Sequence, residues 1–389
     1  MSDANSIYNY ERTLARELSR IKEDPFNSEI LLKYYRSRVA EGLSPARTIK
    51  CLSTVRLISK SLAKSFTDVT KDDIINFVAK TEERKISEWT KHDYKVILKR
   101  FYRWFRDSED YPPEVRWIKV SRNIQNNLQK KDLLTVEEIQ KIADCATNVR
   151  DRAFIWVYFE SMRRLGEILS LKVGDVEFDE LGARLHVNGK MGRDNARIIT
   201  SAPLLATWLN IHPLRKNPDA PIWVTLNRKE ECKQIMYSSV RTMLKDCAER
   251  AGINKRVWLY LIRHSRITPA SKVLSYSLLC STAGWKQGSK MPSVYIHLTG
   301  EDVDEAQCIL NGVARVEGKE EMLRPKVCKR CDTKNIPDSK FCSKCGFPLD
   351  YETAVKMDGI RAKLDRLLDR LTEDPQKLNK LLELVESTS

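Results

Sequence analysis

Five side chains of this sequence have the types needed to cut a phosphodiester without a metal ion: Arg164, Lys190, Arg263, Trp285 and Tyr295. A guanidinium binds phosphate oxygens through its planar fork and keeps its charge. A lysine can give the leaving oxygen its proton, and a tyrosine can attack phosphorus to form a covalent phosphotyrosine. An indole N–H can donate to a phosphate oxygen. Together these side chains predict a phosphoryl-transfer site.

A second group of residues could hold a metal ion. Of the ten cysteines, four form two Cys-x-x-Cys pairs that are ten residues apart. Four thiolates at this spacing can surround one tetrahedral Zn²⁺ and leave no open position, so the site would be structural. A redox pair is the alternative, disfavoured because there are two pairs and no thioredoxin-like context. The predicted ligands are Cys328, Cys331, Cys342 and Cys345.

Helix-length segments with short breaks fill residues 7–117, which we expect to be a helical domain. The clearest helix spans 90–106, where apolar residues at helical spacing form one face. Another face carries cations four residues apart, and such a stripe can follow a phosphate backbone or simply face solvent. The candidate DNA-binding cations are Lys91, Lys95, Lys99 and Arg103.

A polar, basic segment at 118–134 has little periodicity and is predicted to be a linker. A capping-box pattern from Thr135 to Glu138 then opens a second domain over 135–315. Residues 183–189 and 195–201 read as the two strands of a β-hairpin, and Lys190 lies in its glycine-bearing loop. The fold class is therefore mainly α with a small β-sheet, an α+β arrangement.

The end of the sequence predicts a zinc ribbon over 326–350 and an amphipathic helical tail over 351–389. The tail repeats leucine at helical spacing and is interrupted by Asp374-Pro375, which suits packing on the protein itself or on another copy. Lysines and an arginine surround the cysteines, so both DNA and protein are possible contacts of the ribbon.

The chain has 389 residues and a net charge of +15, which favours a polyanionic partner such as DNA, RNA or an anionic membrane. A merely soluble basic protein is the alternative. No apolar run is long enough to cross a bilayer, and the N-terminus lacks the apolar stretch of a signal peptide. We therefore expect a cytoplasmic, nucleoid-associated protein with no membrane partner.

Glu160-Ser-Met-Arg-Arg-Leu-Gly-Glu167 resembles the first conserved box of the tyrosine recombinase (lambda or phage integrase) family, most closely its archaeal members. The register selects Arg164 over Arg163 as the catalytic arginine and makes Glu167 its acidic support. The family usually has glycine where Met162 stands. Its catalytic lysine lies in a β-hairpin loop, as Lys190 does, although Arg193 is close enough to be a rival.

Leu259-Tyr-Leu-Ile-Arg-His-Ser-Arg266 is similar to the family's second box, with Arg263 as the second phosphate clamp. Tyr260 replaces the usual first histidine; a phenol can donate a hydrogen bond but is a poor proton shuttle near neutral pH. Trp285 occupies the third box, and Tyr295 is the expected nucleophile. The resemblance gives supporting roles to His264 and His297.

The resemblance covers about residues 7–315 and implies a site-specific DNA recombinase or integrase that acts through a 3′-phosphotyrosyl intermediate. It implies a helical SAM-like core-binding domain, duplex DNA as the partner, a homotetramer on paired sites and no metal in the chemistry. Two alternatives remain open at this point. One is a catalytically impaired DNA-binding protein on a recombinase scaffold. The other, a zinc-ribbon transcription or RNA-binding factor, leaves the second domain unexplained.

Overall fold

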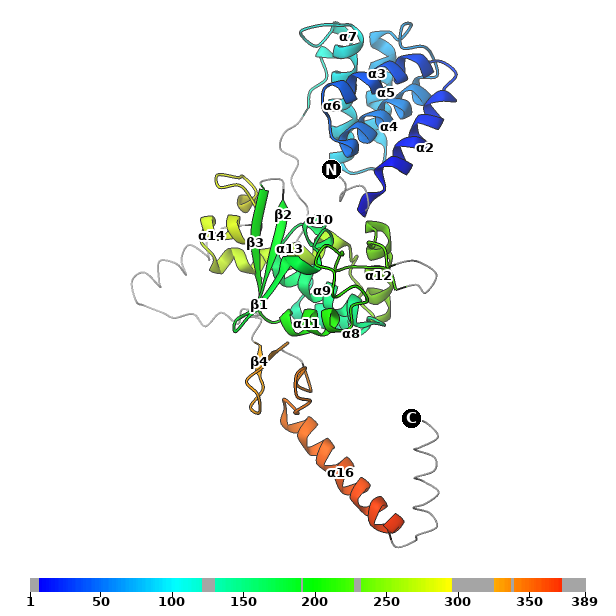
Figure 1. Cartoon of the computed structure of the whole chain (residues 1–389). Helices are drawn as coiled ribbons and strands as arrows, with labels where there is room; N and C mark the ends of the chain where they lie inside the picture. Colours follow the sequence, from blue (N-terminus) through cyan, green and yellow to red (C-terminus); the bar gives the residue numbers. More distant parts are fainter. Residues whose placement is uncertain are drawn as a thin grey trace, which may run out of the picture. The chain divides into compact units, whose positions relative to one another are not determined.

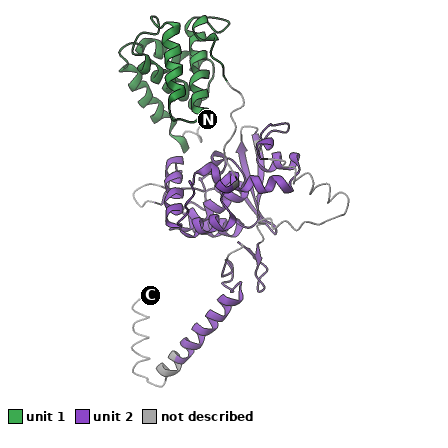
Figure 2. Ribbon diagram, turned by 180° about the vertical axis from the view of Figure 1, so that it is seen from behind, with its two compact units in different colours: residues 1–128 green, residues 129–389 purple. Residues whose placement is uncertain are grey.

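The computed structural model describes residues 7–120, 130–189, 192–226, 232–295, 325–336 and 339–372. Two compact units divide the chain, residues 1–128 and residues 129–389 (Figure 2). Their boundary falls within the segment that the sequence marks as a linker. Among the described helices, none combines the length and the apolar character needed to cross a bilayer.

The described part of the first unit is helical and encloses its own core (Figure 1). In α6, the Ser87 side chain accepts from the backbone N–H of Thr90 and caps the N-terminus. The apolar face predicted for this helix is buried at Ile97, Leu98 and Phe101, which pack into the core. The helices are α2 (Tyr10–Lys22), α3 (Ser28–Ala40), α4 (Pro45–Leu62), α5 (Lys71–Glu83), α6 (Glu88–Phe105) and α7 (Pro113–Arg116).

The second unit packs helices around a small antiparallel sheet (Figure 1). Its helices are α8 (Val136–Asp144), α9 (Val149–Ser161), α10 (Leu165–Leu169), α11 (Ala202–Asn210), α12 (Tyr237–Arg250), α13 (Leu259–Val273) and α14 (Tyr276–Thr282). Short 3₁₀ turns are η1 (Lys130–Asp132), η2 (Val173–Asp175) and η3 (Pro292–Val294). The predicted capping box is confirmed, because Thr135 and Glu138 exchange side-chain-to-backbone hydrogen bonds.

Helix α9 is the centre of this unit. Every residue from Ala153 to Ser161 is buried, so the helix is surrounded on all sides rather than amphipathic. Because α9 is buried, the position of its C-terminal end is fixed. The first candidate arginine, Arg164, follows that end by three residues.

The sheet has the order β1-β2-β3, with β1 (Val176–Asp179), β2 (Gly182–Gly189) and β3 (Gly192–Ile198). The predicted hairpin is present, but the strand predicted over 195–201 is displaced: it pairs from Gly192, opposite Gly189, and ends at Ile198. The reason is tertiary. The buried Glu160 carboxylate accepts the backbone N–H groups of residues 199, 200 and 201, which turns the chain out of the sheet.

The C-terminal part contains two short paired strands, β4 (Lys326–Val327) and β5 (Lys334–Asn335), followed by α16 (Tyr351–Thr372). Along α16 the side chains of Val355, Ile360 and Leu364 are exposed. The predicted interruption at Asp374-Pro375 and the second half of the tail lie outside the described residues.

Candidate active site and cysteine cluster

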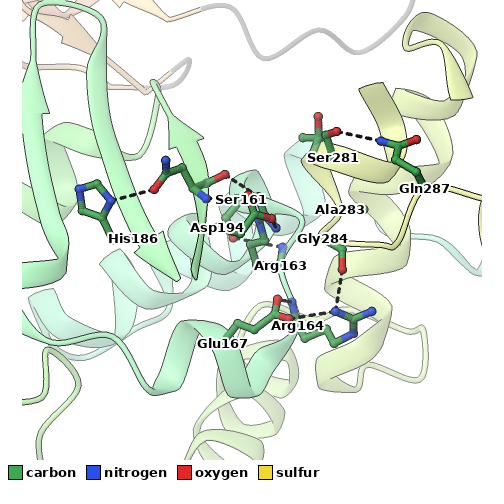
Figure 3. A network of polar contacts seen from close by, with 12 residues as sticks. Ser161, Arg163, Arg164, Glu167, His186, Asp194, Ser281, Ala283, Gly284 and Gln287 are labelled. Atoms are coloured by element: carbon green, nitrogen blue, oxygen red, sulfur yellow. Dashed lines mark hydrogen bonds and ion pairs between the residues drawn. The ribbon is translucent and has the colours of Figure 1, made fainter. Parts of the chain in front are cut away.

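Arg164 begins α10 and is held by two neighbours. The Glu167 carboxylate accepts from the Arg164 backbone N–H and from its Nη1, both at 2.9 Å. Nη1 also donates to the carbonyl of Gly284, 2.8 Å away (Figure 3). The side chain remains 37% exposed, so a ligand can reach a guanidinium whose position is already fixed.

Arg163 has the opposite environment, although it is adjacent in sequence. Its side chain is only 2% exposed and forms an ion pair through Nη1 with Asp194 of β3 at 2.5 Å. Its Nη2 donates to the backbone carbonyl of Asn195 at 2.5 Å. Arg163 is thus occupied inside the protein, which leaves Arg164 as the arginine that a phosphate could contact.

Met162 joins α9 to this arginine pair in the left-handed conformation, with φ 53° and ψ 15°. Such a backbone suits glycine, and a side chain there costs roughly 1–2 kcal/mol. The turn therefore keeps the geometry for which glycine is suited. The Met162 side chain is buried against Ile267 and Tyr295, and this packing compensates for the backbone conformation.

Arg263 lies in α13 and is completely buried. Its Nη2 donates to the carbonyl of Ala283 at 2.9 Å, whereas Nε and Nη1 have no hydrogen-bond partner among the described residues. The guanidinium carbon lies 5.9 Å from the Tyr260 ring centre and 5.6 Å from that of Trp285. Burial, and to a smaller extent the charge of Arg164, lowers the pKa of Arg263. Buried guanidinium N–H groups without acceptors are costly, which favours an anion at this position.

The two clamp arginines therefore meet at one turn. Arg263 is bound by the carbonyl of residue 283 and Arg164 by the carbonyl of residue 284, although the arginines are far apart in the sequence. Gly284 has φ +65°, a conformation that glycine adopts without strain. This turn brings the two positive groups into one site.

Tyr295 follows η3 and is 5% exposed. Its ring centre lies 5.4 Å from that of Trp285 and 5.2 Å from that of His264. The hydroxyl is buried with no hydrogen-bond partner among the described residues, and burial raises the pKa of this phenol. Trp285 thus contacts both the Arg263 guanidinium and the Tyr295 ring, and the phenol is neutral in this conformation.

The remaining second-box residues pack beside this cluster. The Tyr260 ring is partly exposed and makes an edge contact with His264, with the ring centres 4.9 Å apart. Burial, followed by the charge of Arg263, lowers the pKa of His264 to about 4, so its imidazole is neutral near pH 7. His264 therefore adds no charge to a site that already holds two arginines.

Lys190 and His297 lie outside the described residues. The neighbour of the lysine, Gly189, ends β2 next to the support of Arg164: a Cβ built on Gly189 would lie 3.2 Å from Glu167 Oε1. Strand β2 therefore ends beside the carboxylate that holds Arg164.

The four candidate cations of α6 are engaged within the first unit. Lys91 pairs with Glu88 at 2.8 Å, and Lys95 pairs with Glu82. Lys99 donates to the carbonyl of residue 118 at 2.9 Å, and both Lys99 and Arg103 lie over the ring of Tyr111. This face of the helix is therefore more than a solvated stripe of free charges.

The four predicted cysteine ligands gather in one place. Their Sγ atoms all lie within 4.8 Å of one another, close enough to share one metal ion. The backbone N–H of Arg330 points at Cys328 Sγ, 3.4 Å away, and Gly346 after the last cysteine has φ +69°. Four sulfur donors with a backbone N–H toward one of them form a set that fits a tetrahedral metal such as Zn²⁺.

Sequence reasoning missed Glu160 and Asp194, and it set Arg163 aside as a rival of Arg164. All three act through contacts with residues 31 to 41 positions away in the chain. No local pattern marks such pairs. The adjacent arginines were the one available signal, since two neighbouring arginines need two different partners.

The second unit thus places two arginines at one turn, with a tyrosine packed beside them. Residues 132–301 match the phage integrase family. This segment contains Arg164, Arg263, Trp285 and Tyr295.

Tyrosine recombinase XerA of Pyrococcus horikoshii is 24% identical over 250 residues, covering 64% of this chain and 81% of that protein. XerA of Pyrococcus furiosus is 24% identical over 254 residues, with coverages of 64% and 82%. The XerH recombinase in a post-cleavage complex with difH DNA shares the fold at a TM-score of 0.56 and 18% identity, over 79% of this chain and 91% of that one. A lambda integrase dimer bound to a core site shares the fold at a TM-score of 0.56 and 16% identity, over 71% of this chain and 79% of that one.

Proposed function

We propose that this protein is a site-specific DNA recombinase that cuts and rejoins duplex DNA through a 3′-phosphotyrosyl intermediate at Tyr295. The observation that carries the proposal is the convergence of Arg164 and Arg263 on consecutive carbonyls, with Trp285 in contact with both the second arginine and the tyrosine. The match of residues 132–301 to the phage integrase family and the similarity to relatives that are recombinases support the same reaction class.

In the proposed reaction, Arg164 and Arg263 hold the nonbridging oxygens of the scissile phosphate, and the Trp285 N–H donates to one of them. The Nε and Nη1 of Arg263, which have no hydrogen-bond partner among the described residues, are the proposed donors to these oxygens. Tyr295 attacks phosphorus in line: the bond between phosphorus and the tyrosine oxygen forms, the P–O5′ bond breaks, and the phenolic proton passes to water. Lys190 protonates the leaving 5′ oxygen, helped by the phenol of Tyr260. A free 5′-hydroxyl is then available to attack a second strand.

The attack requires Tyr295 to leave the position described above. Its hydroxyl is buried and its ring packs against Trp285, so a DNA backbone has no access to it. Among the described residues, this movement breaks the hydrogen bond from Ser271 Oγ to the Tyr295 carbonyl at 3.2 Å and the ring contacts with His264 and Trp285.

We propose one structural Zn²⁺ bound by Cys328, Cys331, Cys342 and Cys345, with no metal in the chemical step. The support is the spacing of the pairs and the approach of the four sulfurs. When bound, zinc would cross-link the two knuckles and so stabilise a segment too small to build a core of its own.

The proposed partner is duplex DNA, bound by copies of this chain that assemble as a tetramer on paired sites. The net charge of +15 supports a polyanionic ligand. The cations of α6 are part of this proposal, with their present acidic and carbonyl partners exchanged for phosphates. A chromosome-bound, cytoplasmic location follows from such a substrate.

A second candidate function is DNA binding without cleavage on the same scaffold. It is favoured by Tyr260 in the place of a better proton shuttle and by the burial of Tyr295. A nicked DNA duplex that releases a short 5′ strand after cleavage separates the two, because the break then cannot be resealed. A covalent protein–DNA complex that Tyr295→Phe abolishes supports the recombinase. Tight binding of the same DNA without any adduct supports the second candidate.

A further inference from the structure

Arg163 links two parts of the site that are far apart in the sequence. On one side its Nη1 and Nη2 hold β3 through the Asp194 carboxylate and the Asn195 carbonyl. On the other side the same guanidinium lies against the turn at residues 283–284 (Figure 3). Asp194 and Asn195 follow Lys190 by only four and five residues.

The contact with the turn leaves no spare room. A Cβ built on Gly284 would lie 2.5 Å from Arg163 Nη1 and 3.5 Å from its Cζ. The carbonyls of Ala283 and Gly284, which bind Arg263 and Arg164, belong to the backbone on which Arg163 rests. A change in the Arg163 side chain should therefore shift the two carbonyls that accept hydrogen bonds from Arg263 and Arg164.

The two partners of the Arg163–Asp194 ion pair differ in burial. Arg163 is buried, whereas the Asp194 side chain is 50% exposed, so the hairpin is held from the interior by a desolvated cation. A charge-assisted pair of hydrogen bonds from one rigid guanidinium fixes both the distance and the orientation of a strand. Without Arg163, β3 keeps its pairing with β2 but loses its attachment to the turn.

We propose that Arg163 is a positioning residue that couples the hairpin carrying the candidate acid Lys190 to the turn carrying the phosphate clamps. This inference rests on the function proposed above. It assigns to Arg163 the alignment of proton donor and phosphate, with no contact to the DNA.

The test compares DNA in which the leaving atom is the natural 5′ oxygen with DNA that has sulfur in its place. With oxygen, the P–O5′ bond breaks and Lys190 gives O5′ its proton. With sulfur, the P–S bond breaks and the electron pair stays on a thiolate, which is stable enough to leave without a proton, since a thiol has a pKa of about 8.5. A misaligned acid therefore slows only the first substrate.

We expect Arg163→Met to slow adduct formation on the oxygen substrate by about 10- to 100-fold, as a displacement of about 1 Å would. On the sulfur substrate it should stay within about 3-fold of the wild type, and Lys190→Ala should show the same pattern. The matched control is Arg197→Met, which breaks an Arg–Asp pair of the same sheet, with Asp179, that does not touch the turn. It should behave as the wild type on both substrates.

Equal slowing of both substrates by Arg163→Met, or no slowing of either, would overturn the coupling. If even the wild type forms no adduct, the proposed function fails and the coupling is tested by hydrogen exchange of the full chain. Arg163→Met should then speed amide exchange both in β3 and at residues 283–285, and Arg197→Met in the sheet alone. Faster exchange in β3 without any change at the turn would reject the coupling independently of catalysis.

Discussion

Replacing Tyr295 with phenylalanine should abolish cleavage and yet make the free protein more stable. The hydroxyl is the nucleophile of the proposed reaction, but in the free chain it is buried and lacks a hydrogen-bond partner among the described residues. The ring, by contrast, packs between His264 and Trp285, and phenylalanine keeps these contacts.

The magnitude follows from two opposing effects. A buried donor without an acceptor costs about 1–3 kcal/mol, and the substitution removes this cost. The substitution also removes the packing contacts of the hydroxyl oxygen, which reduces this stabilisation by about 0.5 kcal/mol, because each atom pair contributes about 0.1–0.2 kcal/mol. The net stabilisation is about 1 kcal/mol, equivalent to a rise in Tm of about 2–4 °C for a domain of this size.

Urea unfolding of the full chain, compared between wild type and Tyr295→Phe, measures this change. Tyr276→Phe is the matched control, since its hydroxyl donates to the carbonyl of Ser289 and its removal should lower stability by about 0.5–1 kcal/mol. A loss of stability of 1 kcal/mol or more in Tyr295→Phe would refute the reasoning, because it would mean that the hydroxyl is bonded in the free protein.

His264 has its pKa lowered to about 4, against about 6.5 when unfolded, so stability is fully present above pH 6.5 and is lost as the pH falls through 4. Urea unfolding at pH 7.5 and at pH 4 measures this loss in the free energy of unfolding. His264→Asn should make the loss smaller by up to about 3 kcal/mol. Met162→Gly should destabilise by about 1–3 kcal/mol in urea, because lost burial outweighs relief of the left-handed backbone. Metal analysis should give one zinc per chain, lost in Cys342→Ser, while EDTA leaves adduct formation intact. Lys95→Ala should reduce the salt slope of DNA binding by about 0.9, because in the proposed complex Lys95 leaves Glu82 and contacts one phosphate.

Those expectations that rest on local sequence were confirmed most fully. The helix at α6 and the capping box at Thr135 depend on contacts within a few residues, which a pattern reveals directly. The hairpin was predicted, but its second strand was displaced. The Glu160 carboxylate, some forty residues earlier, accepts hydrogen bonds from the backbone at residues 199–201. The sequence near those residues gives no sign of this contact.

The candidate site was predictable as a set of residue types and not as a geometry. The order of Arg164, Arg263 and Tyr295 could be recognised, whereas the turn at 283–284 that joins the two arginines depends on hydrogen bonds across 120 and 20 residues. The partners of the α6 cations were hidden for a similar reason. Glu82 belongs to the preceding helix, and helical periodicity describes one helix at a time.

The central claim is that Arg164 and Arg263 hold a phosphate that Tyr295 attacks. The identity of the residue that becomes attached to DNA tests this claim most directly. The wild-type chain is trapped on nicked DNA, the DNA is trimmed with nuclease and the modified peptide is sequenced by mass spectrometry. The account predicts a 3′-linked nucleotide on Tyr295. A nucleotide on another residue, such as Tyr260 or Tyr276, would contradict it.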